Sequence, residues 1–559
     1  GLHGPDSAFL FSALSRQSPA PCLWLCLNNR QAEKIAENLR FFLPQGNEDQ
    51  VLVLPGSEAN PYRGLSPHPE IAAKRALALW RLLKNHTGFI VTTLASIVTR
   101  LPSPADFQSH CISLEVGRFL PLNHLIQGLQ DSGYVREDPV SEVGEYSIRG
   151  GIVDIFSSAH DNPVRIEFFG DQIDSMREFD PSTQRSIGLI PSCQVVPMRE
   201  MILTEREIAR WHKEAPEYWN EVRFAEALQE KFQFTENREL FNGFEYVFPL
   251  VVDTEHHLLE FLPGSQDLRV VIPDGQGFLE ELDRLSSSHQ DAFQEQHSKG
   301  ELVLPPQRLF FGKKWLEEVL EERQAVFIEQ LSDKPHEVCR FDFQVERKYK
   351  GRIQDILTDL SRWQDSHERV VFVMSSQGMA ERVAHLLEEY GVVSHFVQTG
   401  IDEALAHPLS VMQGKLSEGF YSPSLGLHFL TQENFFEESQ LRTARKAAHP
   451  EIAAQFLSDF RDLKKGDYVV HIDHGIGVFW GLERIGVGEE LKEFVVLSYR
   501  NSAKLYVPID RLGLIQKYSG AGGTAPKIDR LGGASWEKTK RRIKKSMRDL
   551  AEDLLKLYA

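Results

Sequence analysis

The first 110 residues alternate between short apolar runs and longer amphipathic segments. Segments 30–43 and 69–85 repeat apolar residues with helical spacing, which predicts two helices that each bury one face. Continuous apolar runs predict three buried strands, the last passing into the start of a helix: 23–27, 51–55 and 89–98. Because strands that alternate with helices form a parallel sheet, residues 1–110 are predicted to form an α/β unit.

The pattern changes in residues 111–200, where apolar and polar residues alternate in short runs typical of strands. Residue pairs that favour tight turns separate these runs, among them Gly150-Gly151 and Gly170-Asp171. This segment is therefore predicted to be a mostly antiparallel domain inserted into the α/β unit.

Residues 201–335 return to mixed helix and strand, and residues 336–440 are predicted to form a further α/β domain. The first of these segments carries two strand candidates, at 268–274 and 325–330. The second carries a helix, a buried strand and another helix in that order: 352–364, 369–376 and 378–391. Residues 441–461 are predicted to be a linker.

Residues 462–534 alternate apolar and polar positions over several short runs, which predicts a small, strongly bent antiparallel β-barrel. Glycines punctuate these runs: Gly475, Gly477, Gly481, Gly486 and Gly488. The segment contains neither a nucleophile with a neighbouring base nor a phosphate-binding loop. It is therefore predicted to dock another molecule rather than to catalyse a reaction.

Residues 535–559 are predicted to form a basic amphipathic helix. Its basic residues suit phosphate groups such as those of DNA: Lys538, Lys540, Arg541, Arg542, Lys544, Lys545 and Arg548. An apolar stripe on the same helix requires a packing partner: Ile543, Met547, Leu550, Leu554 and Leu557. Both interpretations fit, and the stripe favours a helix packed against another domain.

Length and cysteine content narrow the class of protein. A chain of 559 residues is too long for one core, so three to five domains are expected. It has no apolar run long enough to cross a membrane and no visible signal peptide, and its five scattered cysteines fit a reduced cytoplasm. Cys22 and Cys26 share a strand face with Trp24, where core packing explains them better than a metal-binding pair. We expect a monomer.

The net charge of −18 is distributed unevenly. Residues 462–534 carry a net charge of +1 and residues 535–559 of +4, so residues 1–461 carry about −23. An acidic surface of this size repels the DNA backbone. We therefore expect protein partners, rather than non-specific DNA binding, for residues 1–461.

A nucleotide-binding α/β unit would carry the loop G-x-x-x-x-G-K-[ST], whose backbone, lysine and hydroxyl hold phosphates and Mg²⁺. The sequence has Gly-Lys pairs at 312–313 and 414–415, and neither has the rest of the motif. Residues 4–11 stand near the expected place and contain no lysine, and Asp402-Glu403 does not form a helicase-type acidic box. We predict no catalytic residue and no bound ATP for this chain.

His471, Asp473 and His474 stand close together in the sequence. Such a cluster is able to bind a metal ion or to transfer protons. A turn whose polar side chains bond to the backbone explains the cluster better, so no metal site is predicted.

Particular runs of residues resemble bacterial transcription-repair coupling factors. Residues 54–83 and 144–180, the latter with the run GEYSIRGGIVDIFS, resemble segments that these factors share with UvrB. The runs HIDHGIG, AKLYVP and KIDRLGG resemble their RNA-polymerase-interaction domain, which is related to the CarD-type, tudor-like fold. The resemblance covers most of this chain and only the N-terminal half of such a factor.

The resemblance implies a domain organisation. Residues 1–110 and 201–335 would form a UvrB-like α/β module with a degenerate nucleotide site, and residues 111–200 its inserted, UvrA-binding domain 2. Residues 336–440 would be a third domain of unknown role. Residues 462–534 would be the polymerase-interaction domain, and the final helix would lead into a translocase motor that this chain lacks.

The resemblance also implies positions that bind UvrA on the inserted domain: Arg149, Arg165, Glu145, Tyr146 and Phe156. Arg149 stands beside a double glycine, where its guanidinium is able to form a bidentate pair with a carboxylate. The alternative is that Arg149 and Arg165 are ordinary charges at strand edges. Val135 departs from the family, several members of which carry a basic residue there.

A second set of positions would meet the polymerase β subunit along an exposed edge strand at 481–488. The candidates are Glu483, Arg484, Ile485 and Val487. An exposed edge suits strand addition, in which backbone hydrogen bonds bind and alternate side chains give specificity. The alternative for Ile485 is that it packs inward.

We therefore interpret the chain as the non-catalytic recruitment half of a transcription-repair coupling factor, which binds RNA polymerase and UvrA. ATP and Mg²⁺, as well as duplex DNA, would bind to the missing motor half, an ATP-dependent DNA translocase. Two alternatives are a UvrB-like DNA-binding enzyme and a CarD-like transcription regulator. The missing phosphate loop and the acidic N-terminal region argue against the enzyme.

Overall fold

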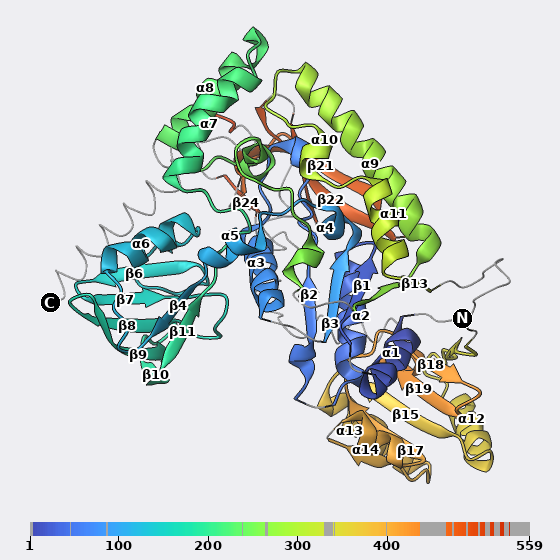
Figure 1. Cartoon of the computed structure of the whole chain (residues 1–559). Helices are drawn as coiled ribbons and strands as arrows, with labels where there is room; N and C mark the ends of the chain where they lie inside the picture. The colour runs from blue at the N-terminus through green and yellow to red at the C-terminus, as the bar shows by residue number, and fades with distance from the viewer. Residues whose placement is uncertain are drawn as a thin grey trace. The chain divides into compact units, whose positions relative to one another are not determined.

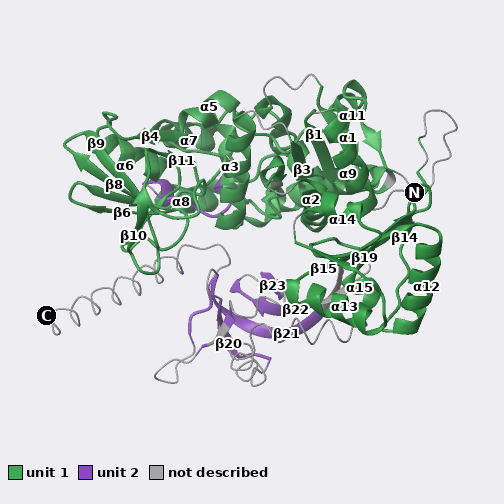
Figure 2. Ribbon diagram, turned by 90° about the horizontal axis from the view of Figure 1, so that it is seen from below, with its two compact units in different colours: residues 1–233, 245–438 green, residues 234–244, 439–559 purple. Residues whose placement is uncertain are grey.

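The chain forms two compact units, residues 1–233 with 245–438 and residues 234–244 with 439–559, coloured separately in Figure 2. The computed structural model describes these residues: 4–18, 20–44, 46–84, 88–236, 239–262, 267–328, 339, 341–398, 400–436, 465–471, 474–487, 490–500, 503–508, 515–518, 526–529 and 536. The predicted linker at 441–461 lies outside the described residues. Of the predicted helix at 535–559, only Trp536 is described.

A five-stranded parallel sheet forms the centre of the first unit, in the order β13-β12-β1-β3-β2 (Figure 1). Its strands are β1 (Cys22–Cys26), β2 (Val51–Leu54), β3 (Phe89–Thr93), β12 (Arg269–Ile272) and β13 (Val326–Phe327). The predicted parallel sheet is confirmed. Strands that follow residue 201 join the sheet that the first 110 residues begin.

Side chains of β1 alternate between the two faces of this sheet. Trp24 packs on one face against two helices: α1 (Pro5–Gln17) and α2 (Asn29–Phe42). Leu23 and Leu25 pack on the other face, which three helices cover: α3 (Pro69–Leu83), α9 (Gly275–Ser298) and α11 (Lys313–Glu322). Further helices in this region are α4 (Leu94–Val98), α5 (Pro104–Ser109), α7 (Glu205–Tyr218), α8 (Ala225–Glu236) and α10 (Pro306–Leu309).

The inserted segment folds into a six-stranded sheet in the order β10-β9-β8-β7-β6-β5, with a two-stranded sheet of β4 and β11. Its elements are β4 (Ile112–Glu115), α6 (Leu122–Asp131), β5 (Val135–Arg136), β6 (Glu145–Arg149), β7 (Ile152–Ile155), β8 (Val164–Phe169), β9 (Gln172–Phe179), β10 (Ser186–Leu189) and β11 (Ser192–Val195). Pairing is antiparallel except between β5 and β6. Alternate residues such as Val153, Ile166 and Met176 form its core together with Leu125 and Leu129 of α6.

A mixed sheet follows, in the order β14-β18-β19-β15-β17-β16. Its strands are β14 (Gln344–Val345), β15 (Arg369–Met374), β16 (His395–Val397), β17 (Leu409–Gln413), β18 (Phe420–Ser422) and β19 (Leu427–Thr431), and its helices are α12 (Ile353–Asp365), α13 (Gln377–Glu389), α14 (Ile401–Ala406) and α15 (Gln432–Phe435). On β15, Val370 and Phe372 face α12 and α13, whereas Val371 and Val373 belong to the core that contains α1 and α2. Helices α1 and α2 therefore lie between two sheets.

The second unit contains a five-stranded antiparallel sheet in the order β23-β22-β21-β20-β24. Its strands are β20 (Tyr468–His471), β21 (Gly475–Val487), β22 (Glu490–Ser498), β23 (Lys504–Pro508) and β24 (Ile515–Lys517). Val469, Phe479, Val495, Leu497 and Val507 form its core. The predicted combination of α/β parts with a small antiparallel β part is thus confirmed. In the described part of the chain, no helix is both long and apolar enough to cross a membrane.

Candidate functional site

The inserted domain presents three arginine–carboxylate pairs on the sheet face opposite its core. Asp154, Arg165 and Arg177 stand side by side on neighbouring strands β7, β8 and β9. The pairs are Arg149 with Asp138, Arg165 with Asp154, and Arg177 with Glu167. This register arises because alternate residues of each strand fill the core and leave the polar residues on the other face.

Arg149 ends β6, directly before Gly150, whose φ of 63° lets the chain turn. Its Nε lies 3.2 Å from both carboxylate oxygens of Asp138, and both side chains are about half exposed. The hydrogen bond to Asp138 raises the pKa of Arg149. Arg149 thus pairs with a carboxylate of its own domain, on a surface that a partner is able to reach.

Arg165 is held more firmly. Its Nε and Nη2 donate to the two carboxylate oxygens of Asp154 at 2.7 and 2.8 Å, and Asp154 is buried. Its guanidinium also lies over the ring of Phe179, 4.6 Å from the ring centroid. The hydrogen bond to Asp154 raises the pKa of Arg165. Arg165 is therefore more an organiser of this face than a free charge.

The remaining UvrA candidates differ in position. Glu145 accepts hydrogen bonds from the backbone N–H groups of Ser141 and Glu142 at 2.8 and 2.9 Å, which shapes the loop before β6. Tyr146 and Phe156 are buried. Their side chains lie below the surface, so direct contact with a partner, as predicted from the sequence, does not fit the structure.

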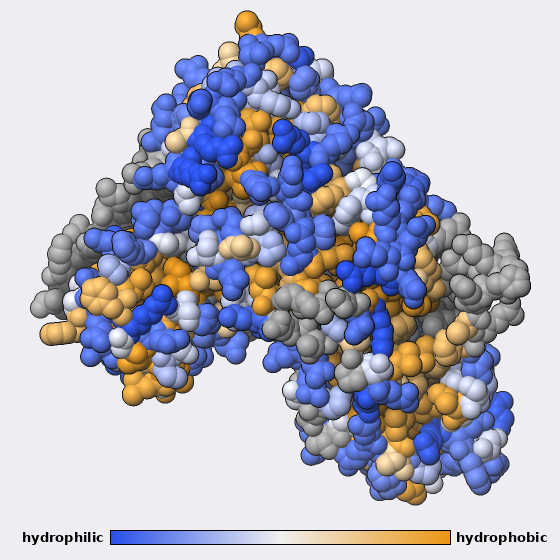
Figure 3. Space-filling model, in the orientation of Figure 1, coloured by the Kyte–Doolittle hydropathy of each residue, from blue (hydrophilic) through white to orange (hydrophobic). Residues whose placement is uncertain are grey.

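The sequence analysis missed several exposed apolar side chains on this domain. Phe169, at the end of β8, is 83% exposed, and Phe119 is 71% exposed. Ile187 and Leu189 of the edge strand β10 are also exposed, and Figure 3 shows hydrophobic atoms where Figure 1 draws this strand. The run FFGD contained a signal, since its second Phe directly precedes a turn, where neighbouring strands end and leave a side chain open to solvent.

Among the described residues of the second unit, β21 has a partner strand on both sides only at its start. Strand β20 pairs with Gly475–Val478, and Gly466 and Asp467 bond to Phe479. From Trp480 to Val487, the described pairing of β21 is with β22 alone. Within the described residues, the backbone of this stretch therefore has no second partner strand, which is what strand addition requires.

The four polymerase-binding candidates lie on this edge. Glu483 is half exposed, and its carboxylate lies 3.7 Å from Nζ of Lys504. Arg484, Ile485 and Val487 stand opposite Glu493, Lys492 and Glu490 in the backbone register, and their side chains lie outside the described residues. Whether Ile485 packs inward therefore stays open.

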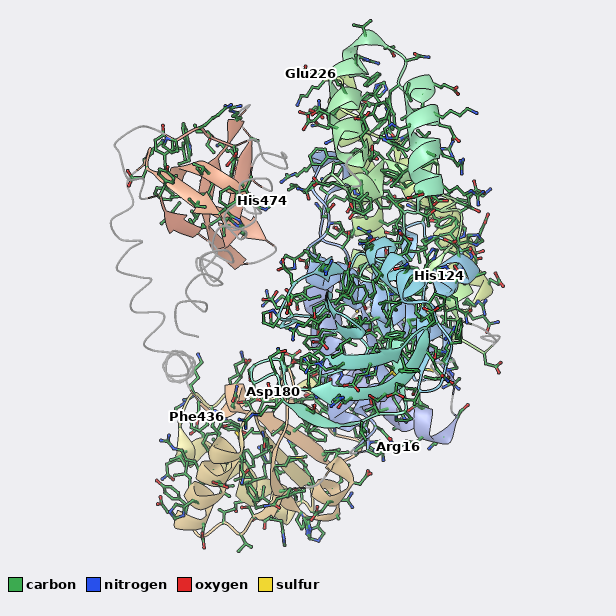
Figure 4. The ribbon with its side chains drawn as sticks, turned by 90° about the vertical axis from the view of Figure 1, so that its left-hand side faces the viewer. Arg16, His124, Asp180, Glu226, Phe436 and His474 are labelled. Carbon is green, nitrogen blue, oxygen red and sulfur yellow. The ribbon has the colours of Figure 1, made fainter. Side chains whose placement is uncertain are left out.

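The predicted turn at His471 and His474 is only partly described, because Asp473 lies outside the described residues. His471 is buried, and its ring centroid lies 4.7 Å from that of His474, which Figure 4 labels. Among the described residues, no group of three or more His, Cys, Asp or Glu side chains could hold a metal ion.

Residues 4–11, near which the sequence analysis expects a phosphate loop to stand, contain the start of α1. Pro5 has no backbone N–H, and the buried carboxylate of Asp6 accepts the N–H of Ser7 at 2.6 Å. A negative side chain at a helix N-terminus takes the position that favours an anion. This arrangement disfavours a phosphate at the start of α1.

A buried polar junction joins the inserted domain to the α/β core, and sequence analysis did not find it. Arg75 of α3 bonds through Nε to Glu200 at 2.7 Å, where the inserted domain ends. The adjacent Arg199 donates to the carbonyl of Asp131 at 3.1 Å, and Ser66 donates to Glu245 at 2.7 Å. Burial raises the pKa of Glu245 to about 7. These residues are far apart in sequence, so no local motif marks the junction.

Models of known protein families match the same two regions of the chain, the inserted domain and the second unit. A model of the UvrB interaction domain matches residues 112–201, and a model of the CarD-like/TRCF RID domain matches residues 463–519. These matches define a chain that combines a UvrB interaction domain with a CarD-like domain.

Relatives that share this combination span all of the chain. It is 28% identical over 581 residues to the transcription-repair-coupling factor of Bacillus subtilis (strain 168), and 27% identical over 574 residues to that of Staphylococcus aureus (strain bovine RF122 / ET3-1). Both alignments cover 100% of this chain and 48% of the relative, so the chain spans about half the length of these relatives. The resemblance to transcription-repair coupling factors that the sequence predicted is confirmed.

Proposed function

We propose that this chain is the non-catalytic recruitment part of a transcription-repair coupling factor. It binds the β subunit of RNA polymerase through residues 462–534 and UvrA through residues 111–200, so that removal of stalled polymerase is coupled to nucleotide excision repair. The observation that carries the proposal is the presence of both domain matches in one chain that aligns from end to end with such factors.

The UvrA-binding surface is the face of the inserted domain that carries the three arginine–carboxylate pairs. Its exposed Arg149 and the neighbouring exposed Phe169 provide the charged and aromatic groups that dominate many protein interfaces. Arg165 keeps this face in shape through its bidentate bond to Asp154. Tyr146 belongs to the core below this face, and Phe156 packs with Val140 and Phe179.

The polymerase-binding surface is the free edge of β21. Backbone groups beyond Phe479 are available to a partner strand, because β20 pairs only with the first part of β21. Ile485 and its neighbours Glu483, Arg484 and Val487 then set the specificity of the contact.

ATP hydrolysis and translocation on duplex DNA belong to a motor outside these residues. Support comes from the missing G-x-x-x-x-G-K-[ST] motif and from the buried Asp6 at the start of α1. Mg²⁺-dependent ATP turnover that copurifies with this chain would overturn this part of the proposal and revive the UvrB-like enzyme.

The first test is binding of the full chain to the isolated β-subunit lobe of a bacterial RNA polymerase. Ile485→Arg should weaken binding by about 100-fold or more, since an unpaired charge would be buried in the contact. Val393→Arg is the matched control, because Val393 is a 79% exposed apolar residue of the first unit. Failure of the unsubstituted chain to bind would contradict the proposed polymerase contact.

The second test is capture of UvrA by the full chain. Arg149→Glu should reduce capture, because the substitution places a second carboxylate beside that of Asp138 on the proposed surface. Arg206→Glu, at an exposed position of α7, serves as the control. Equal capture by all three proteins would remove Arg149 from the binding surface.

A further inference from the structure

Trp480 is an exposed tryptophan on the free edge of β21. Its side chain is 45% exposed, although a ring of this size usually gains by burial. The same edge carries Leu482, which is 53% exposed. Neither residue was a candidate from the sequence.

Alternation along β21 explains why the ring points away from the core. Phe479 stands opposite Leu497 and Gly481 opposite Val496, so Trp480 is an extra residue on β21 without a partner on β22. Phe479 enters the core of the sheet. Trp480 directly follows Phe479 and therefore lies on the opposite face, at this β-bulge and at the point where the pairing with β20 has ended.

Two ammonium groups lie beside the exposed ring. Nζ of Lys465 is 4.1 Å from the centroid of the Trp480 ring, and Nζ of Lys504 is 5.7 Å from it. Lys504 also lies 3.7 Å from Glu483, so the ring and Glu483 share one side of the sheet. The surface is therefore an aromatic ring flanked by two ammonium groups, one of which also lies beside a carboxylate.

We propose that Trp480 is a second anchor for the partner that pairs with the edge of β21. This inference rests on the proposed function, which makes that partner the β-subunit lobe of RNA polymerase. A strand added along residues 480–487 would lie beside the ring and cover it, and buried Trp residues contribute much of the affinity at interfaces. The two ammonium groups fit a partner surface with an apolar centre and carboxylates around it.

The test compares variants of the full chain in binding to the β-subunit lobe. Trp480→Ala should weaken binding by about 30-fold, the scale of an interface hot spot. Tyr390→Ala is the matched control, since Tyr390 is an aromatic residue with 47% exposure in the first unit. Lys465→Glu and Lys504→Glu should each weaken binding, because they remove complementary charge. The loss of affinity should be larger at low salt than at high salt.

The outcomes separate this inference from the function on which it rests. One outcome would overturn the Trp480 anchor and leave the proposed function intact. In it, the unsubstituted chain binds, Ile485→Arg abolishes binding, and Trp480→Ala changes the affinity by less than twofold. No binding by the unsubstituted chain would overturn both. If Trp480→Ala alters the thermal unfolding of the second unit, the two lysine variants decide, and unchanged affinity in both overturns the anchor.

Discussion

Asn38 of α2 forms two hydrogen bonds with Ser417 of the third domain. Its Oδ1 accepts the backbone N–H of Ser417 at 2.9 Å, and its Nδ2 donates to the hydroxyl of Ser417 at 3.0 Å. Asn38 is fully buried, so both of its polar groups need these partners. A side chain that the sequence places on the polar side of a helix is thus part of the buried contact between α2 and the third domain.

A cluster of phenylalanine rings extends this buried contact between the helices α1 and α2 and the third domain. Phe9 of α1 and Phe42 of α2 contact each other and both contact Phe420 and Phe429 of the mixed sheet, at centroid distances of 5.3 to 6.2 Å. Arg16 of α1, labelled in Figure 4, adds an ion pair with Asp402 at 2.8 Å. The third domain therefore shares a core with the first α/β sheet, and the two should respond together to a change in either.

Gly414 provides the first prediction. A Cβ at this position would lie 2.4 Å from Cε2 of Phe41 and 3.0 Å from Cγ1 of Val373, so Gly414→Val should destabilise the shared core by about 1–3 kcal/mol. Gly378→Val is the control, because a Cβ at exposed Gly378 meets no atom within 4 Å. Calorimetry of the full chain should show a lower melting temperature for the first variant only. Hydrogen exchange should then rise in α2 as well as in 409–418, and a rise confined to the third domain would contradict the shared core.

Much of the α/β architecture could be predicted from the sequence. Strands β1 and β2 are continuous apolar runs and β3 begins with one, as is typical of buried parallel strands, and their helices show one clear apolar face. The shared core could not be predicted, because α2 buries a second side through Phe41 and Asn38. A single helical period does not reveal a helix that is covered on two sides.

The candidate sites, like the fold, could be predicted only in part from the sequence. Arg149 and Arg165 were found through the resemblance, but their partners Asp138 and Asp154 depend on the register between strands, which a sequence does not give. The burial of Tyr146 was readable, since Tyr146 and Ile148 alternate with the polar residues of β6. Trp480 was missed, although alternation with Phe479, which enters the core, places it on the other face of β21.

The two arginines of the inserted domain should differ in their effect on stability. Arg165→Leu leaves the buried carboxylate of Asp154 without its bidentate partner, which should cost about 3–5 kcal/mol. Arg149→Leu breaks a half-exposed pair and should cost about 1 kcal/mol or less. Thermal unfolding of the full chain measures both. Equal costs would mean that Asp154 gains a new partner or water when Arg165 is removed.

His428 of the third domain offers a stability prediction for a buried polar cluster. Its Nδ1 lies 2.8 Å from Glu346 and its Nε2 lies 2.6 Å from Glu368, while the rings of Tyr421 and Trp363 lie on it with centroid distances of 4.0 Å. His428→Leu removes the partner of two carboxylates and should cost about 3 kcal/mol or more.

A second substitution separates lost hydrogen bonds from lost packing at His428. The double variant His428→Leu with Glu346→Gln should recover part of the stability, since it removes the buried charge that the first change leaves unpaired. His385→Leu is the control, because His385 is exposed on α13. Unfolding midpoints in urea provide the comparison. No recovery in the double variant would assign the cost to the lost stacking on Tyr421 and Trp363.

Glu245 should make the junction of the inserted domain sensitive to pH. Burial raises the pKa of its carboxyl from an ordinary 4.5 to about 7, with Ser66 and Arg199 opposing the shift. The folded chain therefore holds this proton more tightly than the unfolded chain. The stabilising contribution is complete below pH 4.5 and is lost as the pH rises through 7.

Glu245→Gln isolates this contribution, because the amide stays neutral at every pH. Relative to the variant, the unsubstituted chain should lose on the order of 1–2 kcal/mol of stability between pH 5 and pH 8, a magnitude reduced by the partial exposure of the side chain. Glu226→Gln, at an exposed position of α8, should give no such trend. Differential scanning calorimetry at steps of pH measures both differences. A gap between unsubstituted chain and Glu245→Gln that stays constant from pH 5 to pH 8 would show that Glu245 is already ionised at the junction.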